Sequence, residues 1–400
     1  MKKYSLFSLS SILVFVGFLF LFTPVHAQDT TLPNDSDFTD PTVQLGTSPL
    51  PSPAPDLFFK GRVLKVISEK TEDNLGIAQA SAWSQMVRIE VLDGPSKGKG
   101  IELKYGGLST DKKLVEGEKL VLLAPNGTDN PEQFYIFERY RLDTLYYLGA
   151  FFVLVTIFFA RWKGLTSLLG LGVSVAVLGF YIVPKILAGQ NPLVVTIIGS
   201  FFIATTALYL AHGFNKRTTV ALGSTLITIL IAIALSTSFV HLTNLTGIGS
   251  EEAFYLQTSP VQGINLKGLL LGGIIIGALG VLDDITTGQA AAVDEIFKAN
   301  PMMTRRELIS RSLSVGREHN TSLVNTLALA YAGASFPTLL LFIIYQRPFW
   351  VVMNTESISE EVVRTLVGSI ALMCAVPITT ALAAYFLTGK GSSASNQEPI

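Results

Sequence analysis

The chain has 400 residues, of which 49% are hydrophobic and only 15% charged, and its mean hydropathy is +0.47. Soluble domains carry roughly 25% charged residues, so this composition indicates an integral membrane protein. The net charge of −1 excludes a strong overall attraction to nucleic acid, and the single cysteine, Cys374, excludes an intramolecular disulfide and a cysteine-based metal centre.

The N-terminus has the pattern of a secretory signal peptide over residues 1–27. Two lysines precede an apolar stretch from Leu6 to Phe22, and residues 25–27 resemble a cleavage site. The alternative is an uncleaved anchor, since the stretch is long for a signal peptide. Both alternatives, a cleaved signal peptide and an uncleaved anchor, place the residues that follow outside the cytoplasm. Residues 28–56 are rich in proline and predict a disordered linker.

Residues 57–140 predict a small extracytoplasmic all-β domain, an OB-like barrel. Five alternating segments separated by Gly, Pro and Asn turns begin near Gly61, Gln85, Gly100, Glu118 and Gln133. Barrels of this class can bind oligonucleotides, but these segments lack stacked aromatics interleaved with Lys and Arg. We therefore expect no nucleic-acid partner, and a domain that is structural or binds a protein partner.

Seven apolar segments predict a seven-helix transmembrane domain over residues 143–387. They cover approximately residues 143–160, 165–183, 193–212, 218–240, 266–287, 320–345 and 362–387. With the barrel outside, the inner loops and tail carry ten basic residues and the outer loops four, as the positive-inside rule requires. The inner ten are Arg161, Lys163, Lys216, Arg217, Lys298, Arg305, Arg306, Arg311, Arg317 and Lys390; the outer four are Lys185, Lys267, Arg347 and Arg364. The tail, residues 388–400, is then cytoplasmic.

One cytoplasmic loop, residues 297–318, has a helical pattern of its own. Thr304 and Glu307 form a capping box. A helix at the anionic inner surface is the favoured interpretation, with a partner-docking helix as the alternative.

The most informative polar residues are Asp283 and Asp284, which end the apolar run of the fifth predicted span. If that span begins near Lys267, the carboxylates lie roughly 24 Å into a hydrocarbon core of about 30 Å. The sixth span places Asn325 about 9 Å deep from the inner side. Carboxylates are costly in lipid, so we expect one of the pair to lie within reach of Asn325 or Ser322.

Helical spacing adds further candidates to this polar site. Glu318, Ser322 and Asn325 are at i, i+4 and i+7 and therefore share a face. Oxygen ligands of this kind suit a proton, a hard cation such as Na⁺ or Mg²⁺, or a small polar solute, whereas zinc is not expected. The ligand- or ion-binding candidates are Asp283, Asp284, Thr287, Gln289, Glu318, His319, Ser322 and Asn325.

A second interpretation of the same residues involves no binding site. The fifth span would end early and Asp284 would cap a new helix, leaving the carboxylates hydrated at the membrane surface. The sequence contains no nucleophile elbow, metalloprotease helix, Walker loop or dinucleotide fingerprint. It therefore assigns no catalytic residue, cofactor or metal.

Four long segments resemble the YibE/F-like multi-span membrane proteins of bacteria. They are residues 282–291 (LDDITTGQAA), 314–319 (SVGREH), 322–327 (SLVNTL) and 330–335 (AYAGAS). The resemblance extends over roughly residues 57–387. It implies a protein of the bacterial cytoplasmic membrane with an external N-terminal domain and a cytoplasmic C-terminus. It implies no activity, so it assigns no residue a catalytic role.

Three functional hypotheses remain open at this point. The first is a permease-like protein that moves an ion or a small polar solute through a polar site between the fifth and sixth spans. The second is a non-transporting membrane subunit or sensor, whose external domain binds a protein partner. The third is an intramembrane hydrolase that uses Asp283 and Asp284 as acid and base, although paired carboxylates alone define no reaction.

Overall fold

The computed structural model describes residues 56–72, 82–108, 113–258 and 263–388. The expected signal peptide, and nearly all of the expected linker and tail, lie outside these residues. Two compact units divide between Val155 and Thr156, and each is described by itself.

The first unit contains a five-stranded antiparallel half-barrel in the order β3-β2-β1-β4-β5. Each strand covers one of the five expected segments, because alternate side chains of each segment are apolar and fill the interior. Gly61 marks where the sheet is tightest: a Cβ there would lie 2.7 Å from Ile89 Cγ2 and 2.9 Å from Leu122 Cδ1. The strands are β1 (Leu57–Glu72), β2 (Ala82–Val91), β3 (Gly100–Leu108), β4 (Lys119–Ala124) and β5 (Tyr135–Arg139).

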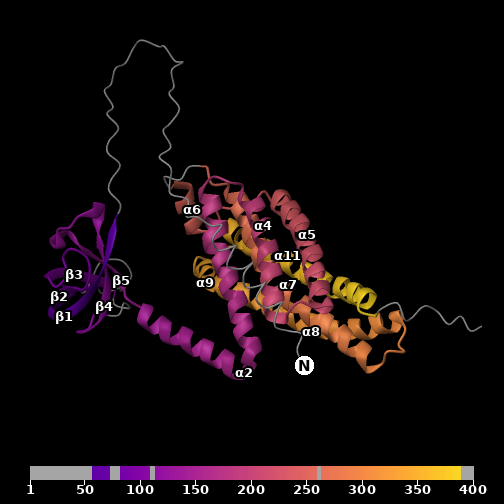
Figure 1. Cartoon of the computed structure of the whole chain (residues 1–400). Coiled ribbons are helices and arrows are strands. Elements are labelled where there is room, and N and C mark those ends of the chain that lie inside the picture. The colour runs from indigo at the N-terminus through magenta and orange to yellow at the C-terminus, as the bar shows by residue number, and fades with distance from the viewer. Residues whose placement is uncertain (1–55, 73–81, 109–112, 259–262, 389–400) are drawn as a thin grey trace, which may run out of the picture. The chain divides into compact units, whose positions relative to one another are not determined.

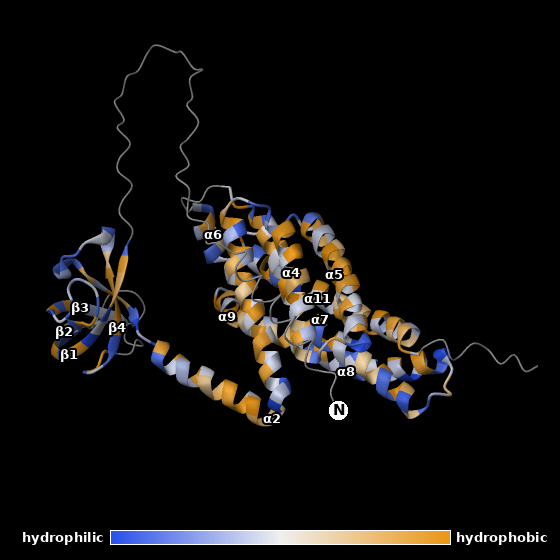
Figure 2. Cartoon of the chain, in the orientation of Figure 1, coloured by the Kyte–Doolittle hydropathy of each residue, from blue (hydrophilic) through white to orange (hydrophobic). Residues whose placement is uncertain are grey.

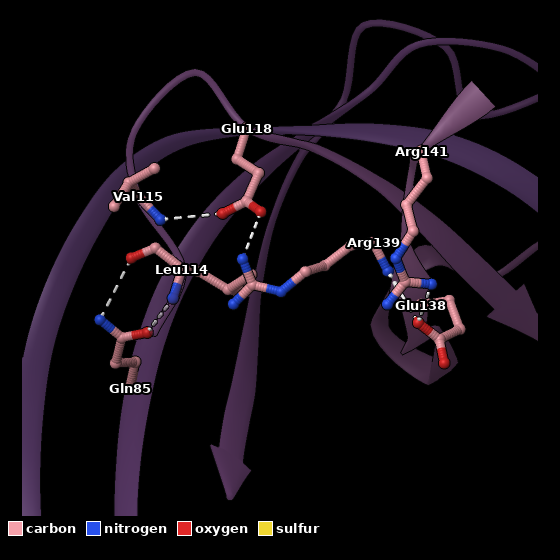
Figure 3. Close-up of polar contacts among 7 residues, drawn as sticks. All are labelled: Gln85, Leu114, Val115, Glu118, Glu138, Arg139 and Arg141. Carbon is pink, nitrogen blue, oxygen red and sulfur yellow. Dashed lines mark hydrogen bonds and ion pairs between the residues drawn. The ribbon is translucent and has the colours of Figure 1, made fainter. Parts of the chain in front are cut away.

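Polar side chains fasten the segment before β4 to the rest of the half-barrel (Figure 3). The Gln85 amide is buried; its Oε1 accepts from the Leu114 N–H at 2.8 Å and its Nε2 donates to the Leu114 carbonyl at 3.3 Å. Glu118 accepts a 2.5 Å bond from the Arg139 guanidinium and a 3.2 Å bond from the Val115 N–H. The side chains of Glu118 and Arg139 are largely shielded from water, which strengthens this ion pair relative to an exposed one.

Only two residues, Tyr140 and Arg141, connect β5 to helix α2 (Leu142–Val177). The Lys119 ammonium bonds the Asp143 carboxylate at 2.6 Å, which ties β4 to the first turn of the helix. Lys60 and Lys119 both lie over the Tyr140 ring, with Nζ 5.7 and 5.8 Å from its centroid. The junction between sheet and helix is therefore fastened by side chains on both sides.

The second unit is mostly helical (Figure 1). Among the described residues, five helical segments are long and apolar enough to cross a membrane, or six if the bent pair α8 and α9 counts as one span. Figure 2 shows apolar residues along most of these helices and polar residues along part of α8. Besides α2, the elements are η3 (Leu178–Ile182), α3 (Val183–Leu187), α4 (Pro192–His212), α5 (Lys216–Leu242), α6 (Glu251–Thr258), α7 (Leu266–Ala299), α8 (Arg305–Ala334), α9 (Phe336–Ile344), α10 (Phe349–Met353) and α11 (Glu356–Phe386).

The helices of the structure do not fix the number of membrane crossings, for which the sequence predicts seven. The stretch Leu142–Leu187 covers two expected spans, and Arg161 interrupts it with φ 53° and ψ −132°. At 1.5 Å per residue its 46 residues measure roughly 69 Å, more than twice a hydrocarbon core. The expected span 320–345 is not one straight helix, because α8 and α9 meet at 59°. Seven crossings therefore stay a prediction.

Helix α7 lies at the centre of the bundle and contacts α4, α5, α8 and α11. Small residues permit these close approaches. A Cβ on Gly272 would lie 2.6 Å from Thr196 Oγ1 of α4, and one on Gly316 of α8 would lie 2.6 Å from Gln289 Oε1 of α7. This packing depends on shape rather than on a hydrophobic driving force, as expected for helices in lipid.

Candidate functional site

The segment that carries Asp283 and Asp284 is an uninterrupted part of helix α7. The helix begins after Asn265, whose side chain accepts from the Gly268 N–H at 2.9 Å, and it continues to Ala299. The interpretation in which Asp284 caps a new helix is therefore wrong. Both carboxylates project from the middle of the helix, where backbone groups are already paired within the helix.

Asp283 lies on the side of α7 that faces α5. It is eleven residues, or about three turns, before Asp294, which therefore shares its face. Asp294 Oδ2 lies 3.9 Å from the Arg217 guanidinium of α5. Asp283 is half-buried, and its Oδ1 is inaccessible to water and has no hydrogen-bond partner among the described residues. An unpaired, buried carboxylate oxygen is unusual enough to require an explanation.

Asp284 is exposed, unlike its neighbour. Successive helical residues point about 100° apart, so the two carboxylates leave α7 in different directions. Thr287 Oγ1 donates locally, to the carbonyl oxygens of Asp283 at 2.8 Å and Asp284 at 3.1 Å. Asp283 and Asp284 therefore do not form a shared carboxylate pair of the kind that acid–base chemistry uses.

Gln289 is buried and joins three helices. Its Nε2 donates to the Ser312 carbonyl of α8 at 2.9 Å and to Thr380 Oγ1 of α11 at 2.7 Å. Nearby, Asn320 of α8 is also buried, and its Nδ2 donates to the Leu372 carbonyl of α11 at 3.4 Å. Sequence reasoning did not identify Ser312, Asn320 or Thr380; the periodicity of apolar residues in α8 could have placed Asn320 on the inward side.

The α8 candidates lie on the outer side of that helix. Glu318, His319, Ser322 and Asn325 are all exposed, whereas Asn320 is buried. Glu318 and Ser322 are each two positions from Asn320, a rotation of about 200°, so they face away from the bundle core. No hydrogen bond between described residues joins Asp283 or Asp284 to Ser322 or Asn325. The structure places the two halves of the expected site on different surfaces.

A second polar cluster lies at the start of α11 and was not anticipated from the sequence. Glu356 Oε1 accepts from the Thr246 N–H at 2.7 Å, the Thr246 hydroxyl at 2.6 Å, the Gly247 N–H at 3.0 Å and the Ile248 N–H at 3.4 Å. Glu360 accepts from the Gly249 N–H at 3.0 Å. The loop after α5 thus holds two carboxylates of α11 with backbone donors. The only feature of the sequence that could have indicated this cluster is the glycine content of the loop, Gly247 and Gly249.

The side chains of this site offer oxygen ligands and groups that can exchange protons. Among the described residues, no group of three or more His, Cys, Asp or Glu side chains is placed to hold a metal ion. Asp283 offers one unpaired carboxylate oxygen, which can accept a proton or contribute to the coordination of a hard cation.

The comparison with protein families identifies the helical part of the chain. The model of the YibE/F-like proteins matches residues 148–389, more than half of the 400 residues. No curated protein and no solved structure matches the chain. The matched region contains the apolar helices, the Asp283 segment and the exposed face of α8, and the chain belongs to the YibE/F-like family of membrane proteins.

Proposed function

We propose that this protein is a permease-like transporter of a small cation or polar solute, and that Asp283 is its central binding residue. The buried, unpaired carboxylate oxygen on a candidate span carries the proposal. An ionisable group inside a membrane span is costly, and its usual justification is a proton, ion or solute pathway.

The other polar features support the same function. Glu318, Ser322 and Asn325 form an exposed polar stripe on α8, which together with α9 passes as a candidate span. A polar stripe in contact with lipid is unfavourable, so we propose that it lines a water-filled vestibule. Asp283 and the stripe lie on different surfaces in this conformation. A shared site would require rotation of α8 against α7, a rearrangement of the kind that alternating access involves.

The two adjacent carboxylates offer a matched pair of variants for the experiment. Purified protein in sealed vesicles is assayed for uptake of a panel of labelled cations and small solutes. We expect Asp283→Asn to abolish uptake of the transported species, because it removes the charge that compensates a cation. Asp284→Asn, which removes an exposed carboxylate one residue away, should retain most of it. Uptake that is unaffected by Asp283→Asn would refute the role of this residue.

The vestibule has a separate test by thiol labelling. Ser322→Cys and Asn325→Cys, each in a Cys374→Ala background, should react rapidly with a water-soluble thiol reagent. Leu230→Cys is the control, because Leu230 is an exposed apolar residue on another candidate span, α5. Equal, slow reaction at all three positions would show that the stripe faces lipid or protein.

A non-transporting subunit with an external partner-binding domain is the second candidate. The half-barrel exposes three aromatic side chains, Phe58, Tyr135 and Phe137, and Phe58 packs edge-to-face on Phe137 at 5.3 Å. We propose that the half-barrel is an OB-like domain, a class that often binds ligands on its surface; the strand order β3-β2-β1-β4-β5 supports this proposal. Membranes with Phe58→Ser/Phe137→Ser protein should then lose a cross-linked partner that wild-type protein retains, while vesicle uptake by the purified variant is unchanged.

A further inference from the structure

A pocket of about 400 Å³ opens where three candidate spans end, at the start of α5 and the ends of α7 and α11. Buried apolar residues hold the three ends together with α8. The pocket is lined by Asn215, Lys216, Arg217, Asp294, Lys298 and Leu387.

The charges around this pocket favour an anion. Lys216, Arg217 and Lys298 contribute three positive charges, and Asp294 contributes one negative charge. The Asp294 carboxylate bonds the Lys298 ammonium at 2.6 Å and lies 3.9 Å from the Arg217 guanidinium, so it holds these two cations side by side. Lys216 is exposed and forms no ion pair among the described residues. The pocket lining thus carries a net charge of +2, and Glu295, which bonds the Lys298 ammonium at 3.0 Å from just outside the lining, reduces the local excess to one positive charge.

The position of the pocket identifies the anion. Candidate spans begin at Lys216 and end at Ala299 and Phe386, so the pocket lies at the depth of lipid headgroups. Tyr385, two residues before the lining residue Leu387, is largely exposed, as is typical of tyrosine side chains at a membrane interface. We propose that this pocket binds the phosphate of an anionic phospholipid, whose acyl chains lie against the apolar surface of the neighbouring helices.

Native mass spectrometry of the full-length protein tests the proposal, with phosphatidylglycerol and phosphatidylcholine of identical acyl chains as probes. Each basic residue near a membrane surface contributes about 1 kcal/mol to the binding of anionic lipid, or roughly a fivefold change in affinity. Lys216→Gln should therefore weaken phosphatidylglycerol binding about fivefold, and Lys216→Gln/Arg217→Gln about 25-fold. Arg347→Gln removes an exposed charge between α9 and α10, outside the lining of the pocket, and should leave the binding unchanged.

Three outcomes would overturn the proposal. The first is equal binding of the two lipids by the wild-type protein. The second is an equal loss of binding in Arg347→Gln, which would indicate a general effect of net charge. The third is displacement of phosphatidylglycerol by an equimolar concentration of inorganic phosphate, which would assign the pocket to a soluble phosphate. Thermal unfolding of each variant in the same detergent confirms that the comparison involves folded protein.

Discussion

Removal of the Glu356 carboxylate should loosen the loop that follows α5. One oxygen of Glu356 accepts four hydrogen bonds from Thr246, Gly247 and Ile248, at 2.6 to 3.4 Å. A hydrogen bond to a charged group contributes about 1.5–3 kcal/mol, but four donors share one oxygen here and the loop is partly exposed. In the variant, water can replace some of the hydrogen bonds that the loop loses. We therefore expect Glu356→Ala to destabilise the helical unit by about 2–4 kcal/mol, well below the sum of four separate bonds.

Hydrogen–deuterium exchange measures this loss of stability directly at the loop amides that bond Glu356. The amides of residues 246–248 should exchange at least tenfold faster in Glu356→Ala, since about 1.4 kcal/mol of lost protection corresponds to a factor of ten. Glu252→Ala is the control: this carboxylate is exposed in the first turn of α6, where its removal should cost less than about 1 kcal/mol. Unchanged exchange of residues 246–248 in Glu356→Ala would refute the reasoning that the carboxylate holds the loop.

Three further predictions concern packing, electrostatics and topology. Gln289→Leu should destabilise the bundle by about 1–2 kcal/mol in chemical unfolding, because two interhelical hydrogen bonds are lost while the volume is kept. A hydrogen bond from Lys113 holds the pKa of Glu69 below its ordinary value; its stabilising effect is present above the unfolded-state pKa and is lost as the pH falls through the folded-state pKa. Carboxyl NMR titration should show that Lys113→Gln returns this pKa towards the ordinary value. Ser310→Cys, in a Cys374→Ala background, should be protected from an impermeant thiol reagent in intact cells, and labelling from outside would contradict the proposed topology.

The elements that the sequence predicted well are those with a strong local signal. The alternation of the five β segments places the strands, since one face of each must be apolar. Thr304 caps the start of α8 by accepting from the Glu307 N–H at 3.3 Å, which is one half of the predicted capping box; the Glu307 carboxylate bonds the Arg311 guanidinium at 2.8 Å. Local signals were insufficient to predict features that depend on contacts between residues far apart in the sequence. The unbroken length of α8, which joins the expected loop helix to the expected sixth span, and its 59° bend to α9 depend on packing against α7 and α11.

The candidate site, too, could be predicted from the sequence only where local helical spacing determines it. Helical spacing correctly grouped Glu318, Ser322 and Asn325 on one face, but spacing does not say which neighbour that face meets. The buried partners of Gln289 come from residues 23 and 91 positions away in the sequence. The Glu356 contacts join residues more than 100 positions apart. Such pairings are set by the tertiary fold, and no local pattern in the chain contains them.

The two-residue connection between β5 and α2 has a mechanical consequence. Two residues span at most about 7 Å, and the Lys119–Asp143 ion pair acts as a brace across the gap. The half-barrel therefore cannot swivel freely on the helix that it precedes. A displacement of the sheet therefore carries the first turns of α2 with it, so the half-barrel and the start of α2 move as one piece rather than as two parts joined by a flexible tether.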